Sequence, residues 1–212
     1  MSYTTPMEPT NAYNTLATVD EATQILNNDG AIRDAVLTRI ASALSATAGL
    51  WGVVLVHRHC TLSPAELMVH RGLICQPETI AQAMVYGTRW LSDGTPFEYS
   101  VEASEPPPRE LLASFVEACG PLQNILGLYY LPQYGTIGSQ SVLMEHSEGR
   151  SNILELVDRS ESLERFIQTG WGPRTEGGLP VTLGCAIYCD TLMTRDSTYH
   201  KNTETHIFRK DE

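Results

Sequence analysis

Two histidines separated by one residue, His57 and His59, are the side chains of this sequence best placed to do chemistry. They follow an apolar stretch from Leu50 to Val56 that is rich in β-branched residues, so we expect them at the end of a buried strand. Alternate side chains of a strand project from the same face, and both imidazoles should therefore point the same way. Because two such rings can hold a metal ion or transfer protons, this strand end is the predicted site.

A metal ion bound by His57 and His59 needs at least one further ligand, and we predict Glu66 for that role. Zinc or non-haem iron would be the usual ion for such a set. Polar residues at the ends of later predicted strands, or in the tail, are alternative ligands: Glu145, His146, Asp190 and His200. Without a metal, the two histidines would act as acid and base. The plainer interpretation is structural, with one histidine capping the strand end and one exposed.

Arginine supplies most of the positive charge, since the chain has twelve arginines and only two lysines, Lys201 and Lys210. The planar guanidinium suits two-pronged recognition of carboxylates and phosphates. We therefore predict that Arg58, Arg150 and Lys201 bind an anionic substrate, and that Arg195 and His200 join the two histidines in catalysis. The tail from Arg195 to Lys201 would then lie against the domain near His57. The alternative is a solvated hydrophilic tail.

Composition excludes several classes of protein. A net charge of −11 over 212 residues argues against nucleic acid as a partner. The sequence contains no P-loop, GxGxxG, GxSxG, HExxH or CxxC motif, so no nucleotide cofactor is expected. There is no apolar run long enough for a membrane and no secretory start, which favours a cytoplasmic protein. We accordingly expect five reduced thiols, at Cys60, Cys75, Cys119, Cys185 and Cys189.

The periodicity of apolar residues predicts a mixture of helices and strands. Helices are expected over residues 18–28, 31–48, 77–87, 109–119 and 160–168, and strands over 50–59, 97–101, 125–131, 141–146 and 181–188. Residues 63–72 fit either a helix or the return strand of a hairpin, and we favour the hairpin. The four glycines and two prolines between Gly170 and Pro180 predict irregular structure.

These elements do not alternate strictly between strand and helix, so the predicted fold class is α+β. We expect a mixed or antiparallel sheet with helices packed against it, in a single domain over residues 18–212. Residues 1–17 are predicted to be a flexible or loosely docked N-terminal arm.

Five residues are similar to the first motif of the cupin family, in which they supply metal ligands on a hairpin: Gly52, His57, His59, Glu66 and Gly72. The spacing departs from that motif, because four residues separate Gly52 from His57 and six separate His59 from Glu66. A histidine for the family's second motif is not evident either. This likeness implies a metal on the two histidines and Glu66.

A wider resemblance, over about residues 50–206, is to a set of uncharacterised fungal proteins with no assigned activity. It is carried by His57-Arg58-His59-Cys60, Glu105-Pro106-Pro107-Pro108, Glu148-Gly149-Arg150, Cys189-Asp190, Thr194-Arg195 and His200-Lys201. The resemblance implies a cytosolic eukaryotic protein that acts on a small metabolite.

The sequence therefore predicts a small-molecule enzyme, of lyase, isomerase or metal-dependent type, with a polar pocket around His57 and His59. Its substrate would be an anionic metabolite. The alternative is a non-catalytic binding or assembly protein, for example a homodimer, in which the histidines are structural.

Overall fold

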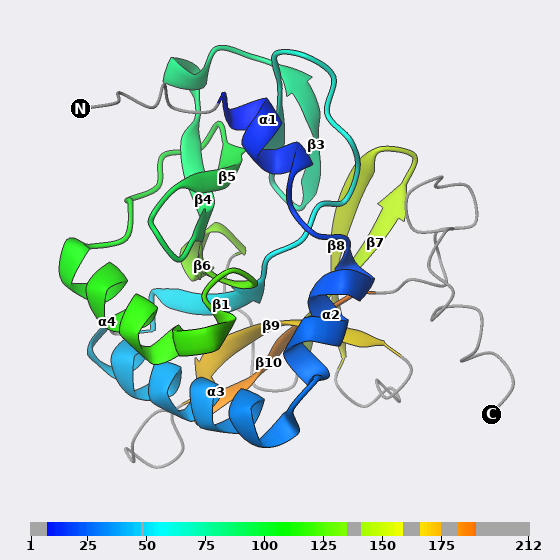
Figure 1. Cartoon of the computed structure of the whole chain (residues 1–212). Coiled ribbons are helices and arrows are strands. Elements are labelled where there is room, and N and C mark those ends of the chain that lie inside the picture. Colours follow the sequence, from blue (N-terminus) through cyan, green and yellow to red (C-terminus); the bar gives the residue numbers. More distant parts are fainter. Residues whose placement is uncertain (1–7, 48, 135–140, 159–165, 175–181, 190–212) are drawn as a thin grey trace, which may run out of the picture.

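Ten strands close into a barrel in the computed structural model, which describes residues 8–47, 49–134, 141–158, 166–174 and 182–189 (Figure 1). Around the barrel the order is β1-β6-β4-β5-β2-β3-β8-β7-β10-β9, and β9 pairs with β1 to complete the circle. The strands are β1 (Trp51–Leu55), β2 (Glu66–Arg71), β3 (Ile74–Thr79), β4 (Tyr86–Leu91), β5 (Pro96–Ser100), β6 (Leu126–Tyr130), β7 (Ser141–Glu148), β8 (Ser151–Asp158), β9 (Ile167–Arg174) and β10 (Thr182–Cys189).

Most neighbouring strands are antiparallel, but β2 with β5 and β7 with β10 pair in parallel. Two glycines allow the close approaches that closure needs. A Cβ atom on Gly52 would lie 2.2 Å from the Tyr129 ring inside the barrel, and one on Gly170 would lie 2.7 Å from Ile187 of β10. Any residue larger than glycine at either position would therefore push these strands apart.

Helices cover one side of the barrel. Helices α3 (Gly30–Leu44) and α4 (Arg109–Cys119) pack against one another on the outside of the barrel, with α3 also against β10 (Figure 1). Each presents apolar residues at intervals of three or four, the spacing that lines one helical face. These residues pack on the outward-facing side chains of β1, β4 and β6 in one core that includes Val36, Ile40, Leu44, Trp51, Val53, Leu55, Trp90, Leu111, Phe115, Leu126 and Leu128.

Two short helices precede α3. Residues of α2 (Val19–Asn27), Ala22 and Leu26, join this outer core, whereas Tyr13 of α1 (Pro9–Asn14) packs with residues of the barrel interior. Of the arm predicted over residues 1–17, α1 is packed against the barrel and its Tyr13 is buried. Asn14 fixes it by bonding both the N–H and the C=O of Leu62. The helix predicted over residues 18–28 is confirmed as α2, and Thr18 and Glu21 form a capping box at its start, each side chain accepting a backbone N–H of the other. None of the helices in the described ranges is long and apolar enough to cross a lipid bilayer.

The predicted α+β fold class is wrong, because the described chain is mostly β and its sheet closes on itself. Residues 77–87, expected as a helix, instead hold the end of β3 and the start of β4. The apolar residues of this segment are spaced as on a helix but do not form a buried face, since Met84 is 66% exposed. The expected irregular stretch from Gly170 begins as part of β9, which runs to Arg174. The helix expected over 160–168 lies mostly outside the described residues, and its last two residues belong to β9.

Residues 63–72 contain β2, which confirms a strand rather than a helix there. Its hairpin partner is β3, joined through Gly72 at φ 61°. The strand that precedes the histidines pairs with β6 and β9 instead.

Candidate functional site

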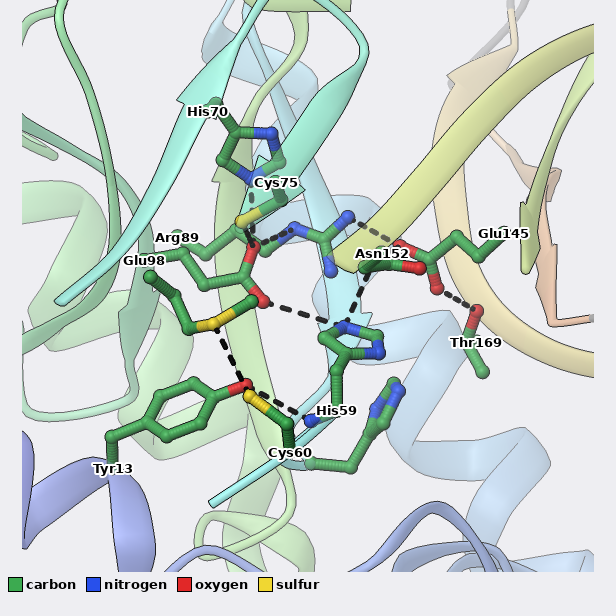
Figure 2. Close-up of polar contacts among 12 residues, drawn as sticks. Tyr13, His59, Cys60, His70, Cys75, Arg89, Glu98, Glu145, Asn152 and Thr169 are labelled. Atoms are coloured by element: carbon green, nitrogen blue, oxygen red, sulfur yellow. Dashed lines mark hydrogen bonds and ion pairs between the residues drawn. The ribbon is translucent and has the colours of Figure 1, made fainter. Parts of the chain in front are cut away.

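The two histidines lie inside the barrel, just beyond β1, which ends at Leu55. They were expected within the strand, and the structure instead places them in the following non-strand segment, where the backbone bonds α1 and the residues after it. His59 N–H donates to the Tyr13 hydroxyl at 2.9 Å, and Arg58 N–H donates to Ala17 C=O. The expected closeness of the imidazoles holds, since the His57 and His59 ring centroids are 4.6 Å apart (Figure 2).

His57 has a defined tautomer. Its Nδ1 lies 2.7 Å from the C=O of Leu55, and a carbonyl only accepts, so Nδ1 carries the hydrogen. The lone pair is then on Nε2, which is buried and has no hydrogen-bond partner in the described part of the chain. Burial, and then the neighbouring His59, lower the pKa of His57 to about 4. A neutral imidazole with one free lone pair is the form that binds metal ions.

Glu145 of β7 lies beside the two histidines, with a carboxylate oxygen within 4.8 Å of a ring nitrogen of each. Its Oε1 accepts from Arg89 at 2.6 Å and from Asn152 at 3.3 Å, and its Oε2 accepts from Thr169 at 3.1 Å. Burial alone would raise the pKa of Glu145, but Arg89 and the histidines outweigh it and hold the pKa at about 2. The carboxylate is therefore ionised and held in one orientation.

A second buried carboxylate, Glu98 of β5, also forms an ion pair with Arg89, the partner of Glu145. Its Oε2 is 2.8 Å from His70 Nε2 and 3.2 Å from Arg89 Nε. Burial alone would raise the pKa of Glu98, but Arg89 and the hydrogen bonds from His59 and His70 hold it well below its usual value. Arg89 thus joins both carboxylates from a position that is 1% exposed.

Two groups of donor atoms result, one on each side of Arg89. We call them the His57 site, formed by His57, His59 and Glu145, and the Cys75 site, formed by His70, Cys75 and Glu98. Within each group, one ligand atom from each residue lies within 4.8 Å of the others. Ligand atoms around a zinc-sized ion are about 3.4 Å apart, because metal–ligand bonds are about 2.1 Å long. Small side-chain rotations would therefore close either group on an ion.

The predicted third ligand, Glu66, stays apart from the histidines. It lies at the start of β2 and makes a two-pronged ion pair with Arg150, whose NH1 is 3.1 Å from Glu66 Oε1. Arg150 also donates to Thr61 C=O, and Arg58 donates to the carbonyls of Asn14 and Leu16. These predicted substrate-binding arginines thus stabilise the chain around the barrel mouth in this structure.

Among the alternative ligands, Glu145 is the one that the structure brings to the histidine pair. His146, next in β7, has its Nε2 3.9 Å from Glu148 instead. Arg195, His200, Lys201 and Asp190 lie outside the described residues.

Several residues of this interior were missed by the sequence reasoning: His70, Cys75, Arg89, Glu98, Asn152 and Thr169. A signal was present, because polar or charged residues stand inside otherwise apolar strand segments, as Glu98 does between Phe97 and Tyr99. In a strand buried on both faces, such a residue must find a partner inside the protein. Local strand pairs place His70 opposite Cys75 and Arg89 opposite Glu98, but bringing them together with the residues of β7, β8 and β9 depends on barrel closure, which the sequence did not reveal.

A scan against models of protein families found no match, and searches of curated proteins and of solved structures found none either. The geometry of the barrel interior is therefore the basis for inferring a function.

Proposed function

We propose that this protein is a metal-dependent enzyme acting on a small molecule, with a divalent transition-metal ion held by His57, His59 and Glu145. The observation that carries the proposal is the Nε2 atom of His57. It is a buried lone pair with no hydrogen-bond donor in the described residues, in direct reach of a second imidazole and an ionised carboxylate. Buried polar atoms without partners are uncommon, and a cation is the partner that this group lacks.

The surroundings of these side chains support metal binding. Metal-bound histidines commonly donate their other ring N–H to a backbone carbonyl, as His57 does to Leu55. Glu145 is oriented by Thr169, Asn152 and Arg89, which leaves lone pairs on its carboxylate for an ion. Oriented ligands lose little freedom when the ion binds, so affinity rises.

Two histidines and one carboxylate are the ligand set of many catalytic zinc and non-haem iron sites. Three protein ligands leave at least one coordination position for substrate. The interior has two carboxylates, Glu98 and Glu145, against one guanidinium, Arg89. A divalent ion would change this excess of one negative charge into one positive charge. An anionic substrate at the open position restores neutrality, which favours an anionic metabolite.

Metal analysis of protein purified without a histidine tag tests the proposal. We expect at least one zinc or iron ion per chain in the wild type. One ion per chain should be lost in His57→Gln and Glu145→Gln, and the wild-type metal content should be retained in Glu66→Gln, the matched carboxylate control outside the barrel interior. Absence of bound metal after expression in zinc- and iron-supplemented medium would refute the proposal, as would full occupancy in Glu145→Gln.

A second candidate function, a non-catalytic barrel with a structural polar interior, is favoured by one observation. Arg89 already pairs with both carboxylates, so the network has an internal cation. A metal-free wild type whose stability depends strongly on Arg89 would support this alternative.

A further inference from the structure

We infer that the barrel contains a second cation site, selective for thiophilic ions such as Zn²⁺, Cd²⁺ or Cu⁺, formed by His70, Cys75 and Glu98. It has no residue in common with the His57 site. Failure of one site therefore does not imply failure of the other.

Three adjacent strands place these residues on one patch of the inner wall. His70 of β2 and Cys75 of β3 are directly opposite in the antiparallel register. Glu98 belongs to β5, the neighbour of β2 on the other side, where His70 is paired with Ser100. The backbone holds directly opposite side chains such as His70 and Cys75 about 5 Å apart, and Glu98, two residues before Ser100, is a diagonal neighbour of His70, so the strands fix where all three side chains start.

The contacts within the patch already converge on one point. His70 Nε2 and Cys75 Sγ lie 2.8 and 3.9 Å from the same oxygen, Glu98 Oε2 (Figure 2). All three side chains are fully buried. An ion at this point would replace the hydrogens that the imidazole and thiol now direct at Glu98. The thiol proton would be released to solvent, and the imidazole proton would move to Nδ1.

Two further observations point to a cation there. Glu98 Oε1 is buried, and its contact with His59 Nε2 is long at 3.5 Å, so this carboxylate oxygen lacks a close donor in the described chain. In addition, the interior carries one more carboxylate than guanidinium. A divalent ion bound with a Cys75 thiolate adds a single positive charge and neutralises that excess by itself.

The donor set determines which ions prefer this site. Thiolate sulfur favours soft ions, whereas the His57 site offers only nitrogen and oxygen donors. Because both sites draw on the same excess negative charge, ions at the two sites repel one another. We therefore expect loading of the Cys75 site to weaken binding at the His57 site.

Cobalt spectroscopy separates the two sites, because only a thiolate ligand gives a near-ultraviolet sulfur-to-cobalt charge-transfer band. Protein expressed in zinc-depleted medium with added Co²⁺ should show this band. The band should persist in Cys60→Ser, a matched buried thiol, and in His57→Gln. It should disappear in Cys75→Ser.

No band in the cobalt-loaded wild type, or a band that survives Cys75→Ser, would overturn the inference. X-ray absorption of the wild-type cobalt protein provides a measurement that needs no variant, in case Cys75→Ser does not fold. It should show a sulfur contribution to the cobalt first shell, and a first shell of nitrogen and oxygen alone would overturn the inference as well. Metal retained in Cys75→Ser but lost in His57→Gln would leave the proposed function standing.

Discussion

Replacement of Arg89 by methionine tests how much the ion pairs of Arg89 with Glu98 and Glu145 contribute to the stability of the fold. Arg89 is 1% exposed, and its guanidinium lies 2.6 Å from Glu145 and 3.2 Å from Glu98. Breaking a buried ion pair by removing one partner costs about 3–5 kcal/mol. Two carboxylates lose their partner here, so we expect the upper end, about 5 kcal/mol, which is a large part of the stability of an ordinary domain.

The dependence on pH makes this prediction specific. In the wild type the pKa values of Glu98 and Glu145 are depressed, so both groups stabilise the fold above the pKa of an unfolded carboxyl, about 4.3, and lose that effect as the pH falls further. In Arg89→Met, burial acts without the guanidinium and the two pKa values move upward. The folded variant then takes up protons at a higher pH than the wild type does. Its deficit should therefore be largest near pH 7 and should shrink as the pH falls.

Urea unfolding of metal-free protein at several pH values between 5 and 8 measures the deficit. Arg71→Met is the matched control, because Arg71 makes an equally short ion pair with Glu78 but is solvent-exposed. We expect this control to unfold like the wild type. If Arg89→Met unfolded with a small deficit that did not change with pH, the assignment of Arg89 as the central cation would be wrong.

Three further predictions concern single residues. His57 has a pKa lowered to about 4, so metal-free protein should lose about 3 kcal/mol as the pH falls from 6.5 to 4, and His57→Gln should lack this contribution when the urea series is extended to pH 4. Tyr13→Phe leaves the buried His59 N–H without its acceptor and should cost about 1–3 kcal/mol, whereas an unchanged melt would show that the hydroxyl is unimportant. Gly170→Ala places a methyl group 2.7 Å from Ile187 and should cost about 1–3 kcal/mol, while a stable alanine variant would contradict the close β9–β10 packing.

The sequence was sufficient wherever local chemistry decides the structure. The capping box at Thr18 and the stop at Gly120 mark real helix ends, because both act within one helical turn. The run before His57 is a buried strand, and the two imidazoles do lie together. Glu145, one of the alternative metal ligands predicted from the sequence, lies beside these two histidines.

Closure of the barrel was not predictable in the same way, because it depends on pairings between distant segments. The parallel contacts of β2 with β5 and of β7 with β10 leave no mark in either strand alone. Arg89 and Glu98 are opposite one another in the local β4–β5 pair, but Arg89 of β4 and Glu145 of β7 lie on strands that are not neighbours, so that ion pair is a product of barrel closure. Glu66 illustrates the opposite error, since it is near His59 in the sequence but is held outside by Arg150.

Every described strand has a neighbour on each side, yet the junctions differ greatly in length. Eight residue pairs join β7 to β8, whereas only Ile74 with Ile153 and Cys75 with Asn152 join β3 to β8. The β1–β9 and β2–β5 junctions are formed by two residue pairs each as well, but among these short junctions it is the separation of β3 from β8 that bares Cys75 and Asn152 to solvent. Opening of the β3–β8 junction would therefore give ions a route to the Cys75 site that breaks few hydrogen bonds. We expect amide hydrogen exchange to be faster along β3 at this junction than along β7, which pairs with β8 over eight residues.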